Sequence, residues 1–166
     1  TIAAVKWAAS ADAPIYMRVG RTKAPSVSAG QAKPFASGEA NVVREGNDIT
    51  GIATGTLVSR AIEASERLAS EGVGARVINM STISPLDEAA VIAAARETGA
   101  IVTAEEALTA GGLGAAVAAV VVRHHPVPMR ILGVTGFAPT GSAEFLLNHF
   151  HLDADGIVAA VRELRG

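Results

Sequence analysis

Residues 48–80, DITGIATGTLVSRAIEASERLASEGVGARVINM, decide the fold of this chain. The apolar run 49–53 is too short for a helix and predicts a buried strand. Residues 57–71 place their apolar side chains on one face at helical spacing, and Gly72 supplies a left-handed stop. Residues 75–80 predict a second buried strand. A strand, a helix and a strand joined by short connections predict a right-handed crossover within a parallel sheet.

The chain downstream of this unit continues to alternate helix with strand. Ser84 is the expected N-cap of the next helix, with Pro85 at its first position and Asp87 in a capping box. Later stop and cap signals are Gly99, Ser142 and Asp153. The expected elements are a helix from Pro85 to Thr98, a strand at 100–104, a helix from Gly111–Gly114 to before Pro126, a strand at 129–134, a short helix after Ser142 and a final helix after Asp153.

The upstream part predicts a helix over residues 2–9 and a strand over 15–19, the last αβ unit of a domain whose earlier part lies outside this chain. Residues 41–47 predict an edge strand that pairs antiparallel with strand 49–53 across the turn 45–48. The predicted fold is therefore α/β, a three-layer α/β/α sandwich around a mixed five-stranded sheet whose first strand is antiparallel.

Composition excludes several classes of function. The 166 residues are 49% hydrophobic and 18% charged, which predicts a folded domain with a sizeable core. A net charge of −2 offers no basic field for nucleic acid or anionic lipid. The longest apolar run is far shorter than the ~20 residues that span a bilayer. With no cysteine, the chain lacks disulfides, thiolate catalysis and cysteine-based zinc sites, and we expect a cytoplasmic protein.

Four segments, in order, resemble the C-terminal domain of the transketolase family. They are NVVREGNDITGIATG at 41–55, VINMSTISPLD at 77–87, the pair Glu105-Glu106 followed by GGLGAAV at 111–117, and Leu132-Gly133-Val134 with Gly141-Ser142 and Asp155-Gly156-Ile157-Val158.

The resemblance implies that residues 1–25 are the tail of a pyrimidine-binding domain, 26–38 a linker and 39–166 the C-terminal domain. A complete enzyme of this kind transfers two-carbon ketol units between sugar phosphates, as in the pentose phosphate pathway. It uses thiamine diphosphate and a divalent cation such as Mg²⁺. Those groups bind to parts that this chain lacks, so we expect the chain to be inactive alone. The expected assembly is a homodimer, or a heteromer with a thiamine-diphosphate-binding N-terminal subunit.

Arg21 is the expected substrate-binding residue. It leaves a predicted strand end, where ligand sites of α/β proteins gather, and a guanidinium binds phosphate through two parallel hydrogen bonds. The resemblance implies that an arginine after this strand anchors the sugar phosphate, and Arg21 matches it by position. Arg18 is expected to be structural, and Lys23 to add weakly to the positive field.

The remaining motifs favour structural roles. The glycines at 111–114 are typical of a tight strand-to-helix turn, although a helix N-terminus can also bind an anion. Glu105 and Glu106 are adjacent and point to opposite faces of a strand, which favours capping or an interface contact over acid–base chemistry. The pairs at 124–125 and at His149 and His151 favour helix ends over a metal site.

Three alternatives remain open. The chain could belong to the beta chain of a 2-oxoacid dehydrogenase, or to deoxyxylulose-phosphate synthase. That synthase has Arg-Tyr-Pro-Arg-Gly where residues 18–22 here read Arg-Val-Gly-Arg-Thr, and this difference favours transketolase. The third alternative is a non-catalytic interaction or regulatory domain built on the same sandwich.

Overall fold

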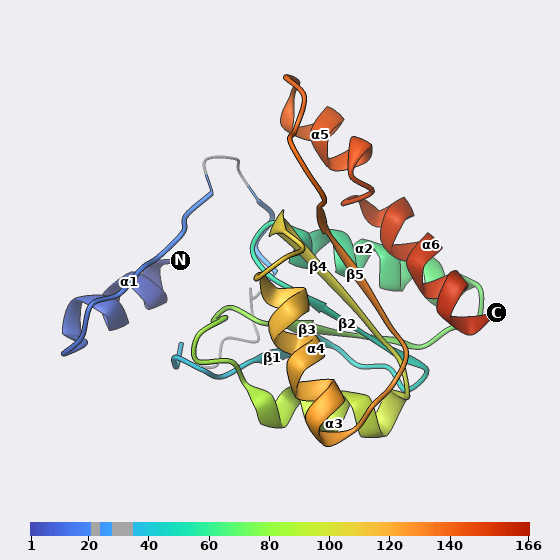
Figure 1. Cartoon of the computed structure of the whole chain (residues 1–166), viewed down its shortest axis with the longest axis horizontal. Coiled ribbons are helices and arrows are strands. Elements are labelled where there is room, and N and C mark those ends of the chain that lie inside the picture. Colours follow the sequence, from blue (N-terminus) through green and yellow to red (C-terminus); the bar gives the residue numbers. More distant parts are fainter. Residues whose placement is uncertain (21–23, 28–34) are drawn as a thin grey trace.

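The computed structural model describes residues 1–20, 24–27 and 35–166 (Figure 1). The described residues form one five-stranded sheet with strand order β1-β3-β2-β4-β5, together with six helices. The elements are α1 (Ile2–Ser10), β1 (Asn41–Arg44), β2 (Ile49–Ala53), α2 (Leu57–Ser70), β3 (Ala75–Asn79), α3 (Glu88–Thr98), β4 (Ile101–Leu108), α4 (Leu113–His124), β5 (Met129–Val134), α5 (Ala143–His149) and α6 (Ala154–Arg165).

The sheet is mixed, as the sequence predicts. Strand β2 pairs in parallel with β3 and with β4, and β4 pairs in parallel with β5. The first strand is antiparallel, but its neighbour is β3 and not β2, so the predicted pairing of residues 41–47 with β2 is wrong. The turn before β2 crosses the start of β3 because Gly46 lies against the backbone there. A Cβ on Gly46 would come within 2.4 Å of the carbonyl carbon of Ala75.

Two helical layers cover the sheet (Figure 1). Helices α2 and α6 pack on one face, and α3 and α4 pack on the other. Because successive strand residues point to opposite faces, Ile49 and Ala53 of β2 enter the first core while Ile52 enters the second. All three side chains are fully buried. The predicted three-layer sandwich is confirmed.

Helix α3 begins three residues later than predicted. Its N-cap is Asp87, not Ser84: the Oδ1 of Asp87 accepts a hydrogen bond from the backbone N–H of Ala90 at 2.9 Å. The Oδ2 of the same side chain accepts from the N–H of Ala40 at 2.8 Å. A carboxylate offers two acceptor oxygens on one short side chain, so Asp87 caps the helix and holds the segment before β1 at once. The predicted stop at Gly99 is confirmed, with a φ of 68°.

The remaining predicted caps are also confirmed. Ser142 accepts from the N–H of Phe145 at the start of α5, and Asp153 accepts from the N–H of Gly156 at the start of α6. None of the described helices has the length and apolar content needed to cross a bilayer.

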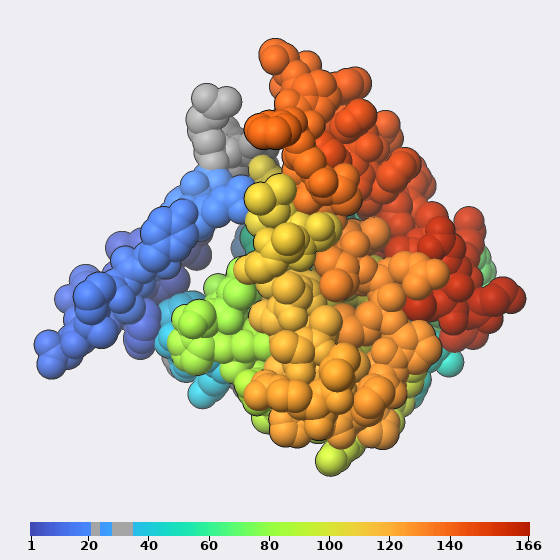
Figure 2. All heavy atoms as spheres, in the orientation of Figure 1, coloured from blue at the N-terminus to red at the C-terminus, as the bar shows by residue number. Residues whose placement is uncertain are grey.

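Residues 1–20 form an N-terminal arm that projects from the sandwich (Figures 1 and 2). The predicted helix is present as α1, yet within the described structure it has no buried residue. The predicted strand at 15–19 does not form, because a strand needs a neighbour for its backbone groups and no described strand lies beside it. Tyr16 is 91% exposed and Val19 60%. The arm therefore presents apolar side chains that the described core does not cover.

Candidate functional site

The candidate site lies at the carboxyl edge of the parallel strands, where ligands bind in open α/β sheets. Strand β2 ends there at Ala53, and residues 54–56 turn into α2 with Gly55 at a φ of 60°. Strand β4 continues past this point to Leu108, longer than the predicted strand 100–104. The extra residues include both adjacent glutamates.

Arg18, Thr56 and Glu106 meet at this edge, and we name them the carboxyl-edge cluster. The guanidinium of Arg18 donates to the backbone carbonyl of Glu106 at 2.6 Å, and its second nitrogen lies 4.0 Å from the Glu106 carboxylate. The hydroxyl of Thr56 donates to the other oxygen of that carboxylate at 2.8 Å. The side chains of Arg18 and Glu106 are 59% and 52% exposed. The cluster joins the N-terminal arm to the end of β4 and to the start of α2.

Glu105 points the opposite way and is 1% exposed. Its Oε1 accepts a hydrogen bond from the N–H of Gly114 in the first turn of α4, at 3.0 Å. A Cβ on Gly112 would lie 2.3 Å from the Oε2 of Glu105, so the turn needs glycine to make room for the carboxylate. This N-terminus, which could have bound an external anion, already holds the chain's own negative charge. The structural role that the sequence predicts for residues 111–114 and for Glu105 is confirmed.

The other predicted site residues lie away from this cluster or outside the described residues. Arg21 and Lys23 lie outside the described residues, and so does much of the expected linker 26–38. Arg18 is in the carboxyl-edge cluster. His124 is in the last turn of α4, with its Nε2 3.9 Å from a carboxylate oxygen of Glu88.

The described side chains offer no metal site. Within residues 1–20, 24–27 and 35–166, no group of three or more His, Cys, Asp or Glu side chains converges to hold a metal ion.

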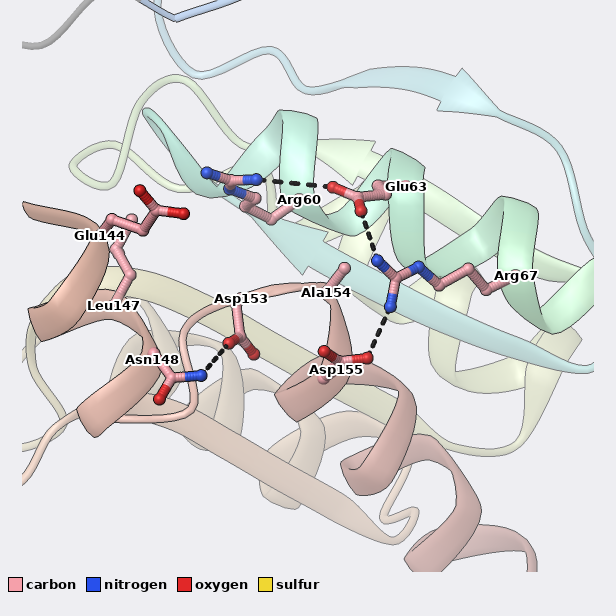
Figure 3. Close-up of a pocket in the computed structure, with 9 residues that line it drawn as sticks. All are labelled: Arg60, Glu63, Arg67, Glu144, Leu147, Asn148, Asp153, Ala154 and Asp155. Atoms are coloured by element: carbon pink, nitrogen blue, oxygen red, sulfur yellow. Dashed lines mark hydrogen bonds and ion pairs between the residues drawn. The ribbon is translucent and has the colours of Figure 1, made fainter.

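A hollow lies away from this edge, between α2 and the α5–α6 region, with a volume of about 260 Å³ (Figure 3). Arg67 bridges it, with one nitrogen 2.6 Å from Glu63 and another 2.5 Å from Asp155. The hydrogen bond that Arg67 donates to Glu63 raises the pKa of Arg67 above its ordinary value, and the charge of Asp155 raises it further. The lining residues are Arg60, Glu63, Arg67, Glu144, Leu147, Asn148, Asp153, Ala154 and Asp155.

Four carboxylates face two guanidinium groups in this hollow, and both of those cations are paired with Glu63. The hollow therefore repels an anionic ligand. The pair of Arg67 with Asp155 joins α2 to α6, the two helices of one layer.

The sequence reasoning missed Thr56 and underrated Glu106. Their contact spans 50 residues of chain, so no local pattern indicates it. One signal was present. When two glutamates end a buried strand, one must face inward and find a partner, which leaves the other on the ligand-binding edge.

Comparison with known proteins gives the following matches. The family model described as transketolase, C-terminal domain, matches residues 38–157. The chain is 42% identical over 154 residues to the 6-deoxy-6-sulfo-D-fructose transketolase subunit of Clostridium sp. (strain MSTE9), covering 92% of this chain and 48% of that relative. It is 40% identical over 151 residues to a subunit of the apulose-4-phosphate transketolase of Phocaeicola vulgatus, covering 90% and 48%.

More distant relatives include a 1-deoxy-D-xylulose-5-phosphate synthase of Heliobacterium modesticaldum, 36% identical over 129 residues, with 76% of this chain and 20% of that protein covered. A solved structure titled "Split gene transketolase, inactive beta4 tetramer" superposes with a TM-score of 0.91 at 39% identity, covering 98% of this chain and 53% of that one. The chain spans about half the length of the transketolase subunits that it matches.

Proposed function

Because this chain belongs to the transketolase family and carries its C-terminal domain, we propose that it is one section of an enzyme that transfers two-carbon ketol units between sugars. The proposed sugars carry a terminal anionic group. Two relatives support this substrate class by their names, one for a sulfo-sugar and one for a sugar phosphate. The cytoplasm is the proposed compartment, in keeping with a chain that has no cysteine.

The observation that carries the proposal is the N-terminal arm. A nine-residue helix without a buried face is not stable in water by itself. The arm also exposes Ile2 by 76% and Tyr16 by 91%. Such a segment needs an apolar surface to pack against. In the proposed enzyme that surface is the remainder of a pyrimidine-binding domain.

The proposed partner also supplies the thiamine diphosphate and Mg²⁺ sites. This partner is a separate N-terminal subunit that assembles with this chain. In a homodimer it would instead be another part of the same polypeptide. The structural match with a split-gene transketolase supports the two-subunit form. This chain then contributes the carboxyl edge of its sheet to the substrate site and performs no proton transfer of its own.

Arg21 is the proposed anchor for the terminal phosphate or sulfonate of the sugar. It follows Gly20 in the sequence, and Gly20 lies at the carboxyl edge: a Cβ there would be 3.9 Å from the methyl group of Thr56. A guanidinium is the side chain best suited to a planar, two-point grip on such an anion. Its role is to position the substrate.

The test is ketol transfer by the chain mixed with its diphosphate-domain subunit. We expect Arg21→Met to raise KM for fructose 6-phosphate by roughly tenfold or more, with a much smaller effect on kcat. Arg96→Met, which removes an exposed arginine of α3, is the matched control. The sulfonate analogue, 6-deoxy-6-sulfofructose, shows which anion the site prefers.

An unchanged KM would remove Arg21 from the site. Absence of transfer from every ketose tested would refute the proposed activity. Turnover with pyruvate as donor, and with none of the ketoses, would favour the alternative of a deoxyxylulose-phosphate synthase.

A further inference from the structure

We infer that Glu106 is a positioning residue, which holds the N-terminal arm on the carboxyl edge of the sheet and so helps to fix Gly20, the residue that precedes Arg21 in the sequence. This inference rests on the proposed function. It assigns a role to a side chain that takes no part in the chemistry itself.

Glu106 ties together three segments that are far apart in the sequence. Its backbone carbonyl accepts from Arg18 of the arm at 2.6 Å. Its carboxylate accepts from Thr56, at the N-cap of α2, at 2.8 Å. The second carboxylate oxygen lies 4.0 Å from the guanidinium of Arg18. One residue of β4 thus fixes the arm two residues before its last described position, Gly20.

The end of β4 can hold the arm because its buried face is fixed through Glu105. The last pair between β2 and β4 is Ala53 with Ala104, and the register with β5 shifts between Ala104 and Leu108. The regular ladder is therefore interrupted between Ala104 and Leu108. The buried Glu105 compensates through its hydrogen bond to the N–H of Gly114. Since neighbouring strand residues point to opposite faces, fixing Glu105 inside the protein also fixes Glu106 outside.

The carboxyl-edge cluster is poorly placed to contribute to stability. Both charged side chains are more than half exposed, and exposed ion pairs add little to the free energy of unfolding. Its effect falls on the arm, whose helix has no buried residue in the described structure. Loss of the Glu106 carboxylate removes its 4.0 Å contact with Arg18 and leaves the hydrogen bond to the backbone carbonyl, so it should loosen the arm while the sandwich stays folded.

The test compares Glu106→Ala with Glu163→Ala in the assembled enzyme. Glu163 is 62% exposed and pairs with Arg130 at 2.9 Å on α6 and β5, so it is a matched loss of a surface carboxylate. We expect Glu106→Ala to raise KM for fructose 6-phosphate about fivefold while the kinetics with fructose, which lacks the phosphate, stay unchanged. Glu106→Gln keeps an acceptor for Thr56 and should give a smaller rise.

Hydrogen–deuterium exchange supplies a readout that does not depend on activity. We expect faster exchange in residues 15–20 of Glu106→Ala and no change in Glu163→Ala. Equal effects on the two sugars, or an arm that exchanges as in the wild type, would overturn the inference. If the wild-type assembly shows no transfer, the proposed function fails while the exchange experiment still tests the hold on the arm. Should Glu106→Ala not fold, Arg18→Met removes both contacts of the arm with Glu106, the hydrogen bond to its backbone carbonyl and the 4.0 Å approach to its carboxylate, and is judged by the same results.

Discussion

Replacing Gly112 by alanine is the sharpest perturbation that this fold offers. The φ of Gly112 is −92°, which any residue adopts, so alanine brings no backbone strain. Its new methyl group would lie 2.3 Å and 2.4 Å from the two carboxylate oxygens of Glu105. The substitution therefore acts on one interaction, the carboxylate that caps α4 from inside the protein.

The expected loss follows from what Glu105 must give up in order to move. Its hydrogen bond to the N–H of Gly114 involves a charged acceptor, and such bonds contribute about 1.5–3 kcal/mol. Its favourable position at a helix N-terminus adds about 0.3–1 kcal/mol. A far-end clash with a flexible side chain is usually relieved cheaply, but this side chain is 1% exposed in a close-packed interior and loses its hydrogen bond to Gly114 when it moves. We expect Gly112→Ala to lower the free energy of unfolding by about 2–4 kcal/mol.

Urea denaturation of the chain measures this loss. Gly111→Ala is the control: Gly111 has a φ of 82° and nothing within 4 Å of a Cβ, so only the left-handed backbone is penalised, by about 1–2 kcal/mol. The decisive variant is Gly112→Ala combined with Glu105→Ala, because the second change removes the clash. Its loss should fall short of the sum of the two single losses by about 2 kcal/mol. Additive losses, or a Gly112→Ala variant as stable as the wild type, would refute the assignment of Glu105 as an internal cap.

Two further predictions concern contacts that the sequence does not reveal. Gly46→Ala places a methyl group 2.4 Å from the backbone of Ala75, where no side chain can move aside, and should lower the free energy of unfolding by roughly 3 kcal/mol. Gly51→Ala is the control in the same urea experiment. Its methyl group would lie 3.7 Å from its nearest neighbour, so it should change the free energy of unfolding far less. Asp87→Ala should lower the melting temperature through a loss of about 1–2 kcal/mol, and Ser84→Ala should leave it nearly unchanged. A larger drop in melting temperature for Ser84→Ala than for Asp87→Ala would identify Ser84 as the cap.

Much of the fold can be predicted from the sequence because its signals are local. The run at 49–53 and the strand at 129–134 match β2 and β5 to the residue. Burial periodicity, left-handed glycines and capping side chains act within a few residues, so they can be recognised without the rest of the chain. The crossover rule then converts these elements into a parallel sheet.

The errors arise where the outcome depends on distant partners. A short turn before β2 predicts a hairpin, but the absence of a side chain on Gly46 lets the chain cross the start of β3, 29 residues away. Residues 15–19 have strand composition but no described neighbour to pair with. The carboxyl-edge cluster depends on contacts across 88 and 50 residues, which no periodicity encodes. Only the chemistry of two adjacent glutamates at a strand end pointed toward it.

The two glutamates also decide how an anion can be recognised at this edge. In many α/β proteins the first turn of a helix after a strand binds phosphate through its backbone N–H groups. Here Glu105 fills that position with the chain's own carboxylate, and Glu106 places a second carboxylate on the opposite, exposed side of β4, near Arg18. A phosphate group that approached this helix end would therefore find no free backbone cradle on α4. In the proposed enzyme the phosphate is bound by a cation from elsewhere, Arg21, which follows the N-terminal arm in the sequence.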